Sequence, residues 1–130
     1  MNTALELPDG NPKTIYGMSK PGIEGVPVAP LFMVGEVMRL GIRKYGLTNW
    51  RHDPISASVY YNAAMRHIMT WWDGDNVDFE SQQPHLAHAV ACLLILMDAR
   101  LSDDLIDDRP SAGLTASYLD SQARRRGDTA

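Results

Sequence analysis

Two apolar runs separated by a short acidic loop constrain the fold of this chain more than any other feature. The first run ends near residue 73 and the second begins near residue 84. In both runs apolar residues recur three and four positions apart, which is the spacing that places side chains on one face of an α-helix. This pattern predicts an all-α fold in which the helices form a bundle.

The sequence predicts three core helices, over residues 30–45, 56–73 and 84–101. Pro30 suits the first turn of a helix, where its missing N–H costs nothing, and Gly46 supplies the stop. The prolines and glycines before position 30 predict an extended arm over residues 1–29 that packs over the core. The C-terminal tail, residues 102–130, is expected to form at most a weak helix from Thr115 to Arg125.

A chain of 130 residues is long enough for one domain with a sizeable core. The helix over residues 84–101 is apolar nearly all round, which suits burial inside a bundle. The helical spacing of Trp71 and Trp72 also predicts that both belong to the core. Three such helices leave apolar faces that one subunit cannot easily cover. We therefore expect self-association, most simply as a two-fold pair of bundles.

Composition excludes several classes of protein. A net charge of −4 argues against a general nucleic-acid binder, which needs a basic face. The one cysteine, Cys92, lies in the most apolar run, where a buried structural thiol is expected rather than a nucleophile. The sequence has no signal-peptide pattern and no apolar run of the roughly 20 residues that a bilayer span needs. We expect a soluble, cytoplasmic protein without a membrane partner.

The acidic loop is the first candidate for a functional site. Four carboxylates within eight positions are followed by two histidines three residues apart: Asp73, Asp75, Asp78, Glu80, His85 and His88. Residues three apart share a helix face, so both imidazoles are expected to face the loop. Carboxylate oxygens attract Mg²⁺ or Mn²⁺, and imidazole extends the set towards Mn²⁺ and other transition metals. The alternatives to a metal site are a solvated loop and histidines that only cap the helix.

Three further groups each have two interpretations. Glu36 either pairs with Arg39 one turn along its helix or faces the acidic loop across the bundle. Trp50 lies in a polar loop, where it either packs in the core or stacks on a base. Arg66 and His67 lie among apolar neighbours, so the charged head needs a partner, either a phosphate or an acid of the loop.

Several segments resemble a known family when they are taken in order. They are Lys20-Pro21, KYGLTNWR at 44–51, RH at 66–67 and DGDNVDFESQQPHLAHAV at 73–90. This set resembles the phage and bacterial dATP/dGTP diphosphohydrolases, which are similar to the all-α, MazG-like nucleoside triphosphate pyrophosphatases. The wider superfamily holds its metals with ExxE and ExxD motifs, whereas the second place here reads HLAH at 85–88.

The resemblance implies a single MazG-like domain over residues 1–130 that assembles as a dimer or a dimer of dimers. It implies hydrolysis of dGTP, dATP or possibly GTP to the monophosphate and pyrophosphate, with two or three Mg²⁺ or Mn²⁺ ions per site. Such an enzyme would serve nucleotide-pool control or supply a purine monophosphate, in the host cytoplasm if a phage encodes it.

Roles follow for individual residues under this resemblance. The expected catalytic carboxylates are Glu36, Asp78 and Glu80. The expected metal ligands are Glu36, Asp75, Asp78, Glu80, His85 and His88. The expected substrate contacts are Lys44, Arg51 and Arg66 with His67 for the phosphates, and Asn49 and Trp50 for the purine.

Two alternatives stay open at this point. His52-Asp53 supplies the doublet of the HD phosphohydrolases, although those enzymes carry it in a helix and Pro54 disfavours helical conformation at Asp53. The segment from 46 to 54 is too polar and broken for a regular element. The second alternative is a non-enzymatic helical adaptor with a solvated acidic loop.

Overall fold

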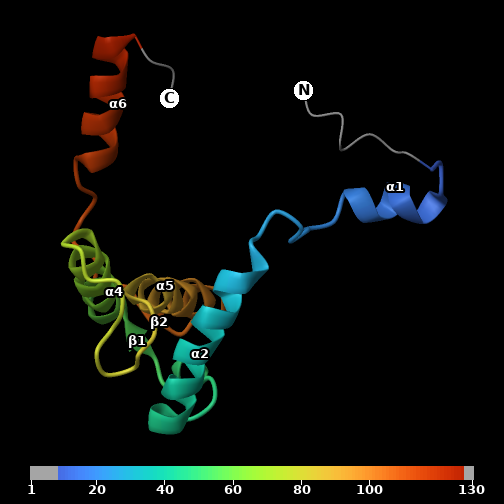
Figure 1. Ribbon diagram of the computed structural model, residues 1–130. Helices are drawn as coiled ribbons and strands as arrows, with labels where there is room; N and C mark the ends of the chain where they lie inside the picture. The colour runs from blue at the N-terminus through green and yellow to red at the C-terminus, as the bar shows by residue number, and fades with distance from the viewer. Residues whose placement is uncertain (1–8, 128–130) are drawn as a thin grey trace. The chain divides into compact units, whose positions relative to one another are not determined.

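The computed structural model describes residues 9–127. The described residues form six α-helices and one pair of two-residue strands, which confirms the predicted all-α class (Figure 1). The elements are α1 Pro12–Met18, α2 Val28–Tyr45, α3 Asn49–His52, β1 Ile55–Ser56, α4 Ala57–Trp72, α5 His85–Leu101, β2 Leu105–Ile106 and α6 Thr115–Arg126. The chain divides into two compact units, Met1–Phe32 and Met33–Ala130.

The first unit contains a short helix, so the predicted extended arm is wrong over residues 12–18. The side chain of Asn11 accepts a 2.9 Å hydrogen bond from the backbone N–H of Lys13, and Pro12 occupies the first helical position. This combination of cap and proline starts a helix, which the many glycines of the arm had obscured. Residues 1–8 of the predicted arm and 128–130 of the predicted tail lie outside the described residues.

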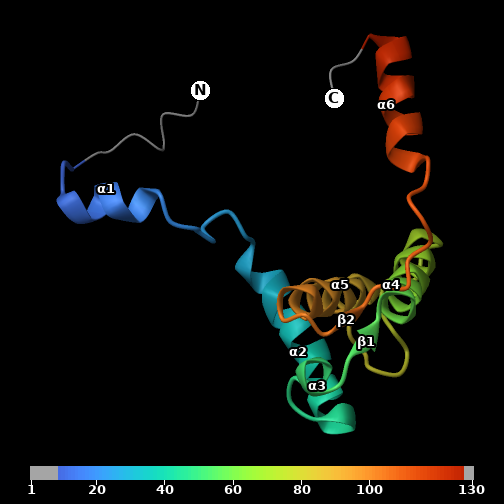
Figure 2. The ribbon, with the colours of Figure 1, turned by 180° about the vertical axis from the view of Figure 1, so that it is seen from behind.

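The core of the second unit lies where α5 packs against α2 and α4 (Figures 1 and 2). Val34 of α2 packs against Ala87 and Ala91 of α5, and Val37 and Met38 complete the cluster. Small side chains on α5 let the helix backbones approach closely. The three predicted core helices are confirmed, and each end lies within two residues of its predicted position.

Local signals explain where these helices end. Gly46 adopts φ +91° and its N–H bonds the carbonyl of Ile42, which closes α2. Gly74, at φ +106°, follows α4 in the same way. Both positions need the left-handed conformation that glycine adopts without strain.

Three short elements between and after the core helices were not predicted: α3, β1 and β2. The sequence predicts no regular element in the segment from 46 to 54. This prediction is wrong, because the segment holds the single-turn helix α3. Strands β1 and β2 pair in parallel, with Ile55 opposite Leu105 and Ser56 opposite Ile106. This pairing ties the entry of α4 to the segment that follows α5. The weak terminal helix is present as α6, which extends one residue beyond its predicted end.

Large apolar side chains remain exposed in the second unit. The indoles predicted to be core are not: Trp71 is 37% and Trp72 79% exposed, because no described element covers the end of α4. The prediction that the helix over residues 84–101 is buried all round is also wrong for the single chain. Its exposed apolar residues are Leu86, Val90, Leu93, Leu94, Met97 and Leu101. None of the helices within residues 9–127 is long and apolar enough to cross a bilayer.

Candidate functional site

The acidic loop between α4 and α5 is ordered by its own backbone. An isolated antiparallel bridge joins Val77 to Pro84 and closes the turn between them. Within the turn, the N–H of Asp78 donates to the carbonyl of Gln83, and the N–H of Gln82 donates to the carbonyl of Asp78, both at 2.8 Å. The carboxylate of Asp78 therefore has a fixed place, unlike that of a solvated loop residue.

Three histidines meet beside this turn. His85 and His88 project from the first turn of α5, and His67 projects from α4. The Nδ1 atoms of His67 and His85 lie 2.9 Å apart. The ring of His88 stacks on that of His67, with centroids 4.4 Å apart and an interplanar angle of 10°. The prediction that His85 and His88 face the acidic loop is thus met, and His67 joins them from the neighbouring helix.

Ser81 and His88 hold the carboxylate of Asp78 in place. The backbone N–H of Ser81 donates a 2.8 Å hydrogen bond to Asp78 Oδ2, and the same oxygen lies 3.8 Å from Nε2 of His88. Ser81 Oγ also bonds that imidazole nitrogen at 2.6 Å. Burial acts to raise the pKa of Asp78, but the Ser81 hydrogen bonds and the nearby imidazoles lower it below its usual value. Asp78 is therefore ionised at neutral pH.

The imidazoles of His67 and His88, in contrast, are held neutral. Burial lowers the pKa of His67, and the neighbouring His88 lowers it further. Burial is also the largest cause of the lowered pKa of His88, although Asp78 opposes it. A neutral imidazole keeps a lone pair on one ring nitrogen, which is the form that binds a metal ion.

The arrangement fits a divalent cation. Ligand atoms of His67, Asp78 and His85 all lie within 4.8 Å of one another. His85 is only 6% exposed, and its Nε2 is buried without a hydrogen-bond partner among the described residues. That nitrogen lies 3.6 Å from Oδ1 of the exposed Asp75. One carboxylate and two imidazoles are a donor set that transition-metal sites use.

A groove of about 450 Å³ opens beside this cluster. It is lined by residues of α2, α4, the acidic turn and α5: Val37, Leu40, Gly41, Lys44, Tyr45, Arg66, His67, Asp78, Glu80, Ser81 and His88. Lys44 Nζ donates a 3.1 Å hydrogen bond to Glu80 Oε1 at its rim. Arg66 is exposed rather than enclosed by apolar neighbours, and its guanidinium pairs with no carboxylate within residues 9–127. Two cationic side chains thus line the groove that holds Asp78.

The structure leaves Glu36 outside this groove. Its carboxylate lies 3.7 Å from the guanidinium of Arg39, which is the local pairing that the sequence allowed as an alternative. Glu36 is not among the α2 residues that line the groove, which are Val37, Leu40, Gly41, Lys44 and Tyr45.

The segment predicted to bind the nucleotide is instead attached to α5. Trp50 Nε1 donates a 2.6 Å hydrogen bond to Asp98, and Arg51 forms two bonds of 2.8 Å to the same carboxylate. Asn49 begins the short helix α3 that carries both residues. None of the three lines the groove. In this structure Trp50 and Arg51 link α3 to α5.

The HD doublet has no place in the groove either. His52 is the last residue of α3, and Asp53 has the extended conformation expected before a proline, with φ −124° and ψ 132°. Neither residue lines the groove of the histidine cluster. The geometry therefore does not favour the HD alternative.

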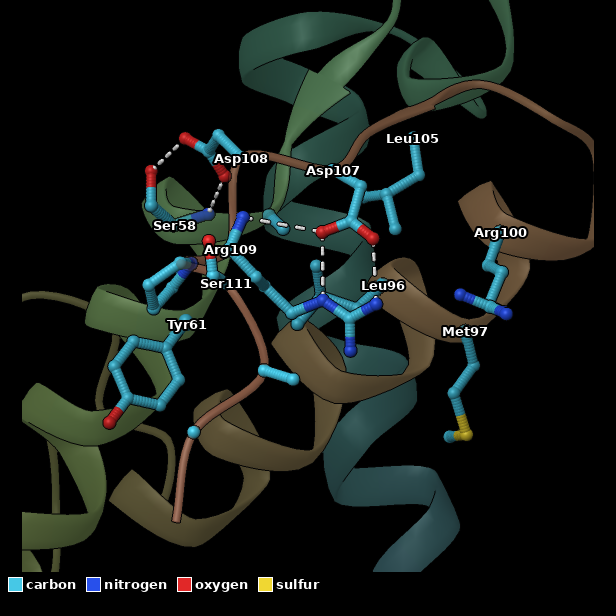
Figure 3. Close-up of a pocket in the computed structure, with 14 residues that line it drawn as sticks. Ser58, Tyr61, Leu96, Met97, Arg100, Leu105, Asp107, Asp108, Arg109 and Ser111 are labelled. Atoms are coloured by element: carbon cyan, nitrogen blue, oxygen red, sulfur yellow. Dashed lines mark hydrogen bonds and ion pairs between the residues drawn. The ribbon is translucent and has the colours of Figure 1, made fainter. Parts of the chain in front are cut away.

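A second, larger cavity of about 970 Å³ lies between α4, α5 and residues 105–113 (Figure 3). The side chain of Arg109 forms two bonds to Asp107, and Asp108 accepts from the N–H and hydroxyl of Ser58 at the start of α4. The Asp108 contact caps α4, since the side chain of Ser56 at the N-cap position makes no capping hydrogen bond. None of the residues predicted to be functional lines this cavity.

Sequence reasoning missed two residues that organise these contacts. Asp98 is a lone acid on the apolar helix α5, and such a charge needs a partner, so a signal was present. Ser81 follows Asp78 by three positions in a turn, a spacing at which an aspartate side chain often bonds the backbone.

Comparison with known proteins identifies the family. The family described as dATP/dGTP diphosphohydrolase, N-terminal, matches residues 10–109. Neither a curated protein nor a solved structure matches the chain. The matched range includes the groove, the acidic turn and the three clustered histidines, and it ends before α6. The chain belongs to the dATP/dGTP diphosphohydrolase family.

Proposed function

We propose that this chain hydrolyses a purine deoxynucleoside triphosphate between its α- and β-phosphates and releases the monophosphate and pyrophosphate. The family description supports dATP and dGTP as substrates, and GTP is a further candidate. Such an activity serves nucleotide-pool control or the supply of a purine monophosphate.

The observation that carries the proposal is the composition of the groove. Lys44 and Arg66 line it together with Asp78 and the imidazoles of His67 and His88. Its volume, about 450 Å³, lies in the range of small-molecule sites. A triphosphate is a polyanion, so its binding requires cations on the protein and a bound metal to screen the carboxylates.

Lys44 and Arg66 hold the phosphates in this proposal. Lys44 exchanges its ion pair with Glu80 for one with phosphate, because a polyphosphate is the more highly charged partner. Arg66 has no carboxylate to exchange and presents a guanidinium fork, which suits two phosphate oxygens at once. The carboxylate of Glu80, once released from Lys44, is free to accept a proton from an attacking water.

The cation proposed for this site is Mg²⁺ or Mn²⁺. Residues of the acidic turn and of α5 would hold such an ion, which would supply Lewis-acid chemistry for activating a water and stabilising charge on the departing pyrophosphate. Ser81 and His88 fix the carboxylate of Asp78 so that it points towards the cluster. The proposed ligand-bearing residues are Asp78, Glu80, His85 and His88, and Asp75 lies beside His85. Glu36 is not included, because it pairs with Arg39 outside the groove.

A second copy of the chain is the proposed partner of the exposed face of α5. Leu86, Val90, Leu93 and Met97 are between 40% and 56% exposed and follow a four-three-four spacing. This spacing makes a continuous apolar seam of the type that packs against another helix. Burying such a seam is favourable in water, so it supports assembly by pairing.

The experiment incubates purified protein with each deoxynucleoside triphosphate and Mg²⁺ or Mn²⁺, and separates the products. Monophosphate plus pyrophosphate from a purine substrate is the expected result. Diphosphate plus orthophosphate would place the cleavage elsewhere, and an inactive wild type would remove the enzyme proposal. Asp78→Asn keeps the shape and the Ser81 contact, yet should abolish turnover. Asp103→Asn, after α5 and outside the groove, is its matched control and should keep full activity.

A further inference from the structure

The side chains of His67 and His85 make a close contact between α4 and α5. Their Nδ1 atoms face each other at 2.9 Å. One nitrogen can donate to the other, but such a bond gives no role to the Asp78 carboxylate oxygen that lies within 4.8 Å of ligand nitrogens of both rings. A hydrogen bond between the two rings therefore does not account for the whole arrangement.

A shared metal ion accounts for more of it. Two nitrogens bound to one Zn²⁺-sized ion at about 2.0–2.1 Å lie roughly 3.3 Å apart, so the observed contact needs only a small widening. A carboxylate oxygen of Asp78 lies within 4.8 Å of ligand nitrogens of both rings. Three protein ligands leave further coordination positions open, as in sites that also bind water or substrate.

The residues around His67 and His85 are of the kinds that orient metal-binding histidines in other proteins. With Nδ1 on a metal, Nε2 of His85 carries its proton and needs an acceptor, and metal-bound histidines commonly donate to a carboxylate. Asp75 Oδ1 lies 3.6 Å away on an exposed side chain that can close the gap. The stacked ring of His88 fixes the plane of His67, and Ser81 fixes Asp78.

We infer that His67, His85 and Asp78 form a binding site for one transition-metal ion, such as Mn²⁺, Co²⁺ or Zn²⁺, and bind it in preference to Mg²⁺, so that Mn²⁺ is the favoured ion of the two that the proposed function allows. Two imidazoles and one carboxylate favour these ions, whereas Mg²⁺ prefers oxygen ligands and retains its waters. His67 thereby becomes a ligand rather than a phosphate contact, and Asp75 becomes a positioning residue for His85. The inference deepens the proposed function, on which it rests for the use of this ion in hydrolysis, but binding itself is measurable without nucleotide.

The experiment titrates the metal-free full chain with Co²⁺ alone and follows its visible absorption, which reports nitrogen coordination. One ion per chain and persistence of the spectrum in a large excess of Mg²⁺ are expected. Mutation of a residue that hydrogen-bonds a metal ligand typically weakens metal binding by about 10- to 100-fold. His67→Asn removes a ligand itself, so its Co²⁺ affinity should fall by at least that factor. His52→Asn is the matched control, because His52 is the one histidine outside the cluster.

Two results would contradict the inferred metal site. Displacement of Co²⁺ by Mg²⁺, or equal affinity of His67→Asn and His52→Asn, would overturn the inference. Asp75→Asn tests the positioning role without touching a ligand and should weaken binding by about 10-fold while the Co²⁺ spectrum keeps its nitrogen character. Circular dichroism of each variant confirms that the helices are retained. If the protein hydrolyses the substrate but does not bind Co²⁺, the inferred metal site is wrong and the proposed function stands. If it binds Co²⁺ but does not hydrolyse the substrate, the proposed function is wrong and the metal site stands.

Discussion

The indole Nε1 of Trp50 donates a 2.6 Å hydrogen bond to Oδ2 of Asp98, and this bond joins α3 to the far end of α5. Arg51 reinforces it with two hydrogen bonds of 2.8 Å to the same carboxylate. One aspartate thereby fixes the segment that connects the groove-lining helix α2 with α4. The sequence analysis expects Trp50 and Arg51 to contact the substrate. In this structure the two side chains attach that segment to α5.

This attachment predicts an acid-sensitive contribution to stability. The hydrogen bonds of Arg51 and then of Trp50 lower the pKa of Asp98 from 3.8 to about 2. Because the unfolded state then binds the proton more tightly, the contribution is complete above about pH 4 and is lost as pH falls towards 2. Asp98→Asn should therefore melt below the wild type at pH 7, and the difference should vanish near pH 2. Thermal melts followed by circular dichroism across this range measure it.

Asp53→Asn is the control for that comparison. Asp53 lies in the same connecting segment, and its carboxylate has no hydrogen bond or ion pair within residues 9–127. This variant should follow the wild-type melting curve at every pH. If Asp98→Asn also followed it, the contact would carry no stability in solution.

The close approach of α2 and α5 predicts intolerance to larger side chains. Ala91 is 3% exposed and packs against Val34. Ala91→Leu should lower the free energy of unfolding by about 1–3 kcal/mol, because the added atoms must push α2 away. Ala116→Leu, on the exposed face of α6, should change it by less than about 0.5 kcal/mol. Urea denaturation separates the two, and equal stabilities would contradict the tight packing.

Helix boundaries were predictable because their signals are local. A proline in a first turn, a glycine with positive φ after a last turn and the spacing of apolar residues act within one or two turns of helix. Strands β1 and β2 had no such signal, since each has two residues and pairs with a partner about 50 positions away. Helix α3 is a single turn whose stability depends on Asp98, again a distant residue.

The candidate site was predictable in part for the same reason. His85 and His88 face the acidic turn because residues three apart on a helix share a face, and that follows from spacing alone. The convergence of His67 with them depends on how α4 packs against α5, which the sequence does not specify. The placement of Glu36 depends likewise on how α2 packs against α5, and this carboxylate, expected in the groove, is not among its lining residues.

The exposed seam of α5 predicts a dimer that one charge disrupts. Leu93 lies near the middle of the seam and is 43% exposed in the single chain. The wild type should sediment as a dimer or larger, and Leu93→Glu should shift it towards the monomer, because pairing would bury an unpaired carboxylate. Tyr118→Glu replaces an apolar residue of α6 that is 61% exposed and should leave the mass unchanged. A monomeric wild type at every concentration would rule the seam out as an interface.

The ion pair between Lys44 and Glu80 predicts how the groove responds to loss of a cation. If Lys44 transfers its hydrogen bond from Glu80 to phosphate, Lys44→Gln removes one charge-assisted bond to the substrate. Such a bond contributes about 1.5–3 kcal/mol, so kcat/KM should fall by about 10- to 150-fold. Steady-state release of pyrophosphate from dATP or dGTP measures the change.

Two comparisons make that measurement specific to Lys44. Lys13→Gln removes the same charge from α1, outside the groove-lining residues, and should leave kcat/KM unchanged. Lys44→Arg keeps a cation at the rim and should recover part of the loss, which a purely structural role of the lysine would not require. Co²⁺ affinity should be the same in all three variants, because Lys44 is not a ligand of the histidine cluster. Unchanged kcat/KM in Lys44→Gln would mean that the phosphates bind elsewhere, despite the groove that Lys44 shares with Arg66 and Asp78.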